Sequence, residues 1–167
     1  MLRRFVLTAI VASLLAAAGV RAAQTAVPTT LKVGGDVTTP LTLTLADVKA
    51  MPRTRVEINQ DGRVVTFEGV LVGEILKRAG APVRGDLHGT ALTTYVLASA
   101  ADGYQILFSL AELDPELTKN DIIVADSVDG KPLVAGQGTF RIVTPKDTRA
   151  SRGIRLLDRL DVVRLKK

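Results

Sequence analysis

Short apolar runs separated by turn residues dominate the hydrophobic pattern of this chain. Such runs, bounded by Gly, Pro, Asn or Asp, are typical of β-strands. Asp61-Gly62 is a strong turn pair, so the two runs beside it are expected to form a hairpin. The predicted strands cover residues 31–34, 41–45, 54–58, 64–67, 91–98, 104–108, 122–125, 132–134, 140–143, 154–157 and 162–165. The pattern therefore predicts a domain built mainly from sheet.

Helical spacing occurs in only two or three places. Residues 70–79 carry one apolar face, and basic residues in the last turn precede a glycine that stops the helix. Thr44 is expected to cap a short helix that Pro52 ends. Ser109 and Glu112 form a capping box that opens another short helix. Because strands and helices do not alternate regularly, the expected fold class is α+β, with a dominant mixed or antiparallel sheet.

The N-terminus predicts an export signal. The signal has three parts: two early arginines, an apolar run at residues 5–20, and small residues before the expected cleavage after Ala22. The run is short for a membrane span, although an uncleaved anchor stays open as an alternative. Residues 23–30 are expected to be a flexible lead-in, and residues 31–167 a single domain. The mature protein is therefore predicted to be periplasmic or secreted, with no membrane segment.

Composition narrows the classes of function. Removing residues 1–22 takes away three arginines and no acid, so the formal net charge falls from +5 to +2. This small charge, with few aromatic residues, excludes nucleic acid as an expected partner. The chain has no cysteine, which excludes disulfides, thiolate nucleophiles and thiolate metal ligands. No catalytic motif is present, and the single histidine, His88, is expected to be exposed and structural, so no catalytic or metal-binding residue is assigned.

The most informative segment is residues 138–155. Arg141 stands inside the apolar run 140–143, where a charge is costly unless something satisfies it. Further basic residues follow at short intervals: Lys146, Arg149, Arg152 and Arg155. Planar guanidinium groups can bind two oxygens of a phosphate or carboxylate at once. The segment therefore predicts a site for an anionic ligand.

An internal explanation of the same arginines stays open at this point. Arg141 could be paired with a carboxylate of the protein itself, for example Asp102 or Asp126, because buried charges are normally paired. Arg152 could equally belong to a solvated edge. Tyr104 is expected to lie in the core with its hydroxyl bonded to a neighbour.

Several phrases occur in an order and spacing that resemble a known family. Among them are Phe67-Glu-Gly-Val-Leu71 and Gly138-x-x-Arg141-Ile-Val-x-Pro145. The others lie within residues 43–52, 75–80, 102–110 and 123–130. Together they resemble the oxidoreductase molybdopterin-binding domain family, which has the sulfite-oxidase fold, over roughly residues 31–165. The resemblance implies a pterin phosphate bound by Arg141, and it extends the same role to Arg149 and Arg152.

The resemblance also implies what this chain lacks. Catalytic members of the family hold molybdenum through a cysteine thiolate as well as the pterin, and this chain has no cysteine. Its signal fits export in the unfolded state, in which the chain would arrive without the pterin.

The sequence therefore predicts a periplasmic, oxidoreductase-like domain without molybdenum–cysteine catalysis. It would carry molybdopterin or no cofactor, and act as a binding or accessory module for a redox or signalling protein. Two alternatives stay open: a genuine pterin-dependent oxidoreductase without a protein thiolate, and a small-anion-binding protein. Oligomeric state is not predicted.

Overall fold

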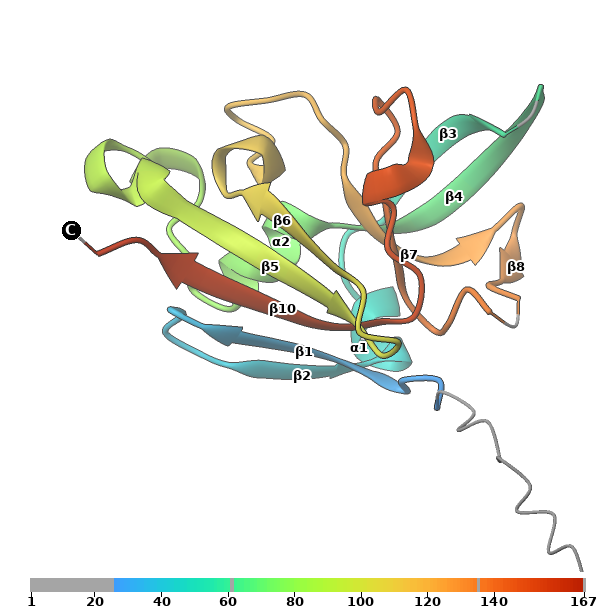
Figure 1. Cartoon of the computed structure of the whole chain (residues 1–167), viewed down its shortest axis with the longest axis horizontal. Coiled ribbons are helices and arrows are strands. Elements are labelled where there is room, and N and C mark those ends of the chain that lie inside the picture. The colour runs from blue at the N-terminus through green and yellow to red at the C-terminus, as the bar shows by residue number, and fades with distance from the viewer. Residues whose placement is uncertain (1–25, 61, 135, 167) are drawn as a thin grey trace, which may run out of the picture.

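The computed structural model describes residues 26–60, 62–134 and 136–166, so the predicted signal peptide and residues 23–25 of the predicted lead-in lie outside it. Two sheets form within these residues (Figure 1). Sheet A has the order β2-β1-β10-β5-β6, and sheet B has the order β3-β4-β7-β8, with β9 also paired to β7. Only β1 and β10 pair in parallel, and the other neighbours are antiparallel. The predicted α+β class with a mixed sheet is confirmed.

The element bounds are as follows. Sheet A contains β1 (Thr30–Gly35), β2 (Leu41–Thr44), β5 (Thr94–Ala100), β6 (Gln105–Ser109) and β10 (Leu157–Arg164). Sheet B contains β3 (Thr54–Gln60), β4 (Arg63–Leu71), β7 (Ile123–Val128), β8 (Lys131–Pro132) and β9 (Arg141–Val143). The α-helices are α1 (Leu45–Lys49) and α2 (Val72–Arg78), and the 3₁₀ turns are η1 (Arg84–Asp86), η2 (Gly89–Thr93), η3 (Ala111–Leu113) and η4 (Ala150–Arg152).

Local sequence signals account for several of these elements. The β3–β4 hairpin forms around the predicted turn, where Gly62 has a φ of +84° and its N–H donates to the side-chain oxygen of Asn59 at 2.8 Å. Thr44 caps α1, with Asp47 completing the capping box. Helix α2 lies within the predicted range and buries its apolar face. The hairpin and both helices confirm the prediction from periodicity.

Three local predictions are wrong. Ser109 and Glu112 do make both bonds of a capping box, but only the 3₁₀ turn η3 follows. The start of the predicted strand 91–98 is the 3₁₀ turn η2. The two strands predicted at 154–157 and 162–165 are replaced by the single strand β10. The reason is that the charged residues in the middle of β10 lie on the open face of sheet A, while alternate residues face the core.

Strand β9 places alternate side chains in two different apolar clusters. Ile142 is fully buried in the main core, which fills the space between sheet A, α2 and sheet B. Val143 belongs to a smaller cluster on the other face of sheet B, together with Phe67. Arg141 also lies on that second face, directly opposite Ala125 of β7 in the register. Because the alanine side chain is small, it leaves room for the guanidinium to extend towards Phe67.

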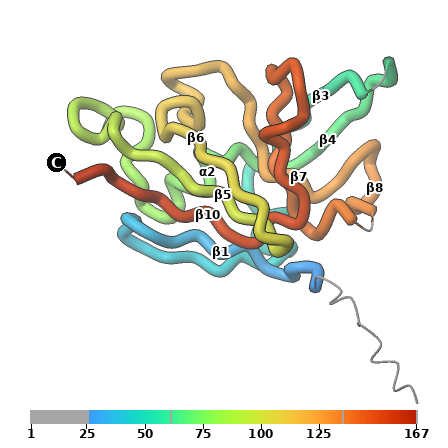
Figure 2. The backbone as a smooth tube through the Cα atoms, in the orientation of Figure 1, coloured from blue at the N-terminus to red at the C-terminus, as the bar shows by residue number. Residues whose placement is uncertain are grey.

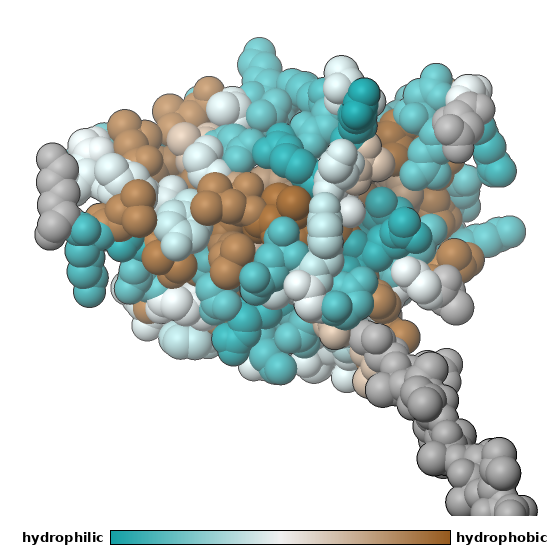
Figure 3. Space-filling view, in the orientation of Figure 1, coloured by the Kyte–Doolittle hydropathy of each residue, from teal (hydrophilic) through white to brown (hydrophobic). Residues whose placement is uncertain are grey.

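The outer face of sheet A has no helix over it in Figure 1. Figure 3 shows apolar residues, in brown, gathered over the part of this face where Figure 1 places β5 and β6. Leu107 of β6 is 54% exposed there. Within the described part of the chain, no helix has the length and apolar character needed to cross a membrane.

Candidate anion-binding site

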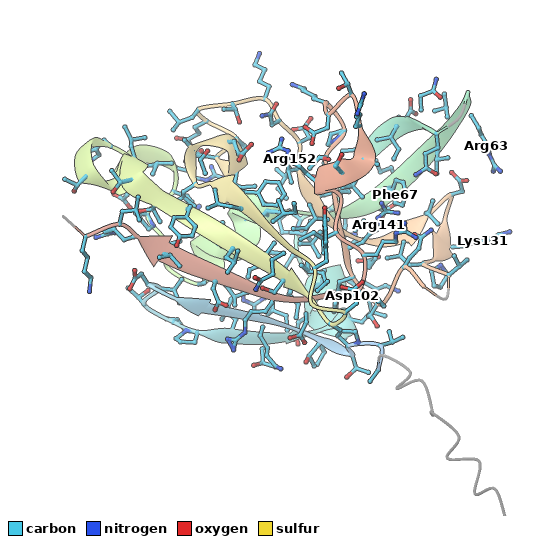
Figure 4. All side chains as sticks on the ribbon, in the orientation of Figure 1. Arg63, Phe67, Asp102, Lys131, Arg141 and Arg152 are labelled. Carbon is cyan, nitrogen blue, oxygen red and sulfur yellow. The ribbon has the colours of Figure 1, made fainter. Side chains whose placement is uncertain are left out.

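The guanidinium of Arg141 is buried without a complete set of partners. The residue is 7% exposed, and its guanidinium carbon lies 4.6 Å from the centre of the Phe67 ring. Its Nη1 donates to the side-chain oxygen of Gln137 at 3.2 Å. Its Nε is buried and has no hydrogen-bond partner among the described residues. Figure 4 shows Arg141 beside Phe67, with Arg152 set apart from both. A buried donor without a partner is rare and needs an explanation.

No internal carboxylate supplies that partner. None of the ion pairs within residues 26–60, 62–134 and 136–166 includes Arg141. Asp126 instead accepts two bonds from Arg53, at 2.7 and 2.9 Å, and Asp102 accepts the N–H of Tyr104 at 3.1 Å. The internal pairing considered for Arg141 therefore does not hold for either acid.

The electrostatic surroundings of Arg141 disfavour its charge. Burial lowers the pKa of this guanidinium, and the positive charge of Arg155 lowers it further. An arginine keeps its proton in proteins nevertheless, so Arg141 remains a cation in a poorly solvated position. Such a site is stabilised when an anion binds.

Both nitrogens on one edge of the Arg141 guanidinium lack a partner among the described residues, and one of them, Nε, is shielded from solvent by the surrounding protein. The described residues form no hydrogen bond with either its Nε or its Nη2. The same edge of Arg152 binds both oxygens of Asp147, each at 2.8 Å. Arg152 thus already makes a bidentate contact with an internal carboxylate, while the corresponding edge of Arg141 has no partner among the described residues.

A cavity of about 320 Å³ lies against Arg141. Polar groups from β3 and from the segment after β9 line it alongside apolar ones, and the lining includes Asn59, Gln60, Thr144, Asp147, Thr148 and Gly153. A β-carbon at Gly153 would lie 3.6 Å from Nη2 of Arg141. Glycine at this position therefore leaves space directly beside the open edge.

The other two predicted arginines, Arg149 and Arg152, do not present unpartnered guanidinium groups to this cavity. Arg152 bonds both Asp147 and, at 2.8 Å, Glu112, and these bonds raise its pKa, with that to Asp147 contributing most. Its guanidinium also lies 5.2 Å from the Phe108 ring. Arg149 is exposed and is not among the residues lining the cavity. Arg141 is thus the predicted residue with a free binding edge.

A second cavity, of about 370 Å³, lies on the other side of η4. Arg155 lines it, together with Asp102 and Tyr104. Tyr104 is 48% exposed, so its predicted core position is wrong. Its hydroxyl does find a neighbour, because it donates to the carbonyl oxygen of Ser151 at 2.8 Å.

Sequence reasoning missed the two residues that hold Arg141. Gln137 stands between two glycines that both have a φ of +85°, and this turn places its amide beside the strand that follows. Its position between glycines and just before the arginine strand was the available signal. Phe67 lies far from Arg141 in the sequence, so only the pairing of β4 and β9 with β7 brings the two together.

The residues present fit the phosphate of a molybdopterin, but they do not supply the protein thiolate that would bind its metal. The Nη2 of Arg141 lies beside Gly153, which lines the cavity, and a guanidinium N–H there suits a phosphate oxygen. The chain has no cysteine that could bind the metal as a thiolate. In the described ranges, no group of three or more His, Cys, Asp or Glu side chains is arranged to hold a metal ion.

The fold is that of a molybdopterin-binding type of domain. A family model described as the oxidoreductase molybdopterin-binding domain matches residues 19–166, and the chain belongs to this family. The crystal structure of the sulfane dehydrogenase SoxCD from Paracoccus pantotrophus is similar, with a TM-score of 0.62 and 19% sequence identity. The match covers 80% of this chain but 37% of the SoxCD chain. A search of the curated proteins found no match. The family and the fold predicted from the sequence are confirmed.

Proposed function

We propose that the mature protein is an exported binding or accessory module that holds an oxyanion on Arg141, without molybdenum catalysis through a protein thiolate. The observation that carries this proposal is the Nε–Nη2 edge, unpartnered among the described residues, of a buried guanidinium that lines a cavity of about 320 Å³. Export is supported by the signal-like pattern of residues 1–22. An accessory role implies a periplasmic redox or signalling protein as its partner.

The chain's own residues would hold such an anion in a definite way. Nε and Nη2 of Arg141 would donate to two oxygens, while Gln137 keeps Nη1 occupied and so fixes the plane of the fork. Phe67 supports the guanidinium from one face. A bound molybdopterin would supply this phosphate and the dithiolene sulfurs for a metal. The thiolate that completes the metal site in catalytic members has no counterpart here.

The metal content of the natural protein tests the absence of thiolate-based catalysis. The mature chain is purified from the periplasm of its own host, and molybdenum is measured by mass spectrometry alongside pterin fluorescence. We expect no stoichiometric molybdenum. Stoichiometric molybdenum with an associated pterin would instead establish the alternative, a pterin-dependent oxidoreductase without a protein thiolate.

Thermal unfolding with phosphate and sulfate tests the anion site separately. The wild-type melting temperature is expected to rise with either anion, and Arg141→Met is expected to abolish the rise. Arg159→Met is the matched control, because this arginine lies on β10 and bonds its own neighbour Asp161 at 3.4 Å. An equal rise in all three proteins would show that the anions act elsewhere.

A further inference from the structure

The segment of residues 147–153, here called the strap, separates the two cavities. It contains η4 and lies in the connection that leads from β9 of sheet B to β10 of sheet A (Figure 2). Both cavities are lined by Ala150 and Gly153 of the strap. The cavity on one side contains Arg141, and the cavity on the other side contains Arg155. The strap is therefore the wall between two cavities, each lined by one arginine and one aspartate.

Two side-chain hydrogen bonds attach the strap to the turn between β5 and β6 and to η3. The hydroxyl of Tyr104 donates to the carbonyl oxygen of Ser151 at 2.8 Å. Nη1 of Arg152 donates to Glu112 of η3, also at 2.8 Å. The other bonds of Arg152, to Asp147, join two residues of the strap to each other. The strap is thus bonded within itself and is joined to the rest of the protein by hydrogen bonds with Tyr104 and Glu112.

Besides these bonds and the contact of the Arg152 guanidinium with the Phe108 ring at 5.2 Å, few contacts hold the strap in place. None of its seven residues is buried, so it contributes no side chain to the apolar clusters. Its backbone bonds are local, from the N–H of Gly153 to Ala150 at 3.0 Å and from the N–H of Asp147 to Thr144 at 3.3 Å. Segments with few buried apolar contacts open at a small fraction of the global unfolding free energy.

Opening of the strap would change what the site can hold. Arg155 is near enough to Arg141 for its charge to act on it, yet the strap stands between their cavities. With the strap displaced, the spaces of about 320 and 370 Å³ would become one cleft with a guanidinium on each side. A ligand with an oxyanion at one end and a polar body would then contact both arginines.

We propose that the strap is a gate over Arg141. It opens when its hydrogen bonds with Tyr104 and Glu112, here called the latch, break, and it closes again over a bound phosphate-bearing ligand. The proposal rests on the anion site described above, but the latch itself can be tested with no anion present. Its failure and that of the anion site are therefore distinguishable.

Amide hydrogen exchange of the full mature chain measures the latch directly. In phosphate-free buffer, Tyr104→Phe is expected to raise exchange at Asp147 and Gly153 about fivefold, the effect of losing one ordinary hydrogen bond. Glu112→Gln is expected to act in the same direction, because glutamine can still serve the capping box but loses the charged bond to Arg152. Amides of β5 and β10 should exchange as in the wild type, which shows that the variants are folded.

Tyr95→Phe is the matched control, since Tyr95 lies in β5 opposite Ser109 and the tyrosine bonded to the strap is Tyr104, and it should leave strap exchange unchanged. Inorganic phosphate is then added to the wild type, in which we expect slower exchange of the strap. In the double variant Tyr104→Phe/Glu112→Gln, phosphate association measured by NMR line shape should be several-fold faster. Strap exchange in the double variant equal to that in the wild type would overturn the latch, whether or not phosphate binds.

Discussion

Replacing Arg141 by methionine separates a ligand site from a structural ion pair. The variant loses one hydrogen bond from a charged donor to Gln137, about 1.5–3 kcal/mol, and a cation–π contact with Phe67, roughly 0.5–2 kcal/mol. It gains by removing a buried unpaired donor, worth about 1–3 kcal/mol, and by no longer burying a charge. Methionine also packs well against an aromatic ring.

These opposing effects nearly cancel. In phosphate-free buffer, we expect the free energy of unfolding of Arg141→Met to lie within about 1 kcal/mol of the wild type. Breaking a buried ion pair would instead cost about 3–5 kcal/mol. In phosphate at about a hundred times its dissociation constant, the wild type should gain about 2.7 kcal/mol and the variant nothing.

The assay is urea unfolding followed by far-ultraviolet circular dichroism, for both proteins, with and without phosphate. Arg159→Met, on the open face of sheet A, controls for the loss of a positive charge. A loss of 3 kcal/mol or more without phosphate would refute the reasoning, because it would show that Arg141 has an internal counter-ion. Equal stabilisation of both proteins by phosphate would refute the assignment of the anion to Arg141.

Three further predictions concern the scaffold around the site. Arg53→Ala should cost about 3–5 kcal/mol in urea unfolding, because it leaves the fully buried carboxylate of Asp126 without its partner. Gly69→Ala should cost about 3 kcal/mol in the same assay, since its β-carbon would lie 2.0 Å from a carbonyl oxygen of β7. Hydrogen bonds from Arg152 lower the pKa of Asp147 below its ordinary 3.8. The stability from this pair is therefore fully present above about pH 4 and lost as the pH falls through the lowered pKa, and Asp147→Asn should remove that acid dependence of unfolding.

Each of these three predictions has a control variant or a measurement that could contradict it. Gly85→Ala introduces a β-carbon with no atom within 4 Å, so a cost equal to that of Gly69→Ala would contradict the steric argument. Replacing Arg53 and Asp126 together by apolar residues should recover much of the loss, and a double variant as unstable as Arg53→Ala would contradict it. For Asp147, a difference from Asp147→Asn that stays constant from pH 6 to pH 2 would exclude the shifted carboxylate.

The parts of the fold that follow from neighbouring residues were predictable. The β3–β4 hairpin depends on a turn pair between two apolar runs, and α1 depends on a capping box within four residues. Strand β10 was not predictable in the same way. Its charged residues Asp158, Arg159 and Asp161 interrupt the apolar pattern, and they are tolerated only because one face of sheet A is open to solvent.

The candidate site likewise has one residue that could be predicted from its neighbours in the sequence and one that could not. Arg141 was recognisable because a charge inside an apolar run is exceptional in any fold. The role of Arg152 was not, because its partner Glu112 lies 40 residues earlier and approaches it only when η3 and η4 come together. Before folding, the apolar run around Arg141 marks it as buried, but nothing local shows which of the two arginines will find internal carboxylates.

The sequence by itself determined the class of fold, the family, the absence of any thiolate chemistry and the identity of one buried arginine. Each of these depends on residue types, on their spacing or on contacts within a few residues. Only the tertiary structure decided which arginine keeps an open edge, which is neutralised by internal carboxylates, and that a strap divides the cleft between Arg141 and Arg155. Those outcomes depend on which distant carboxylates and carbonyl oxygens the two sheets bring within hydrogen-bond distance.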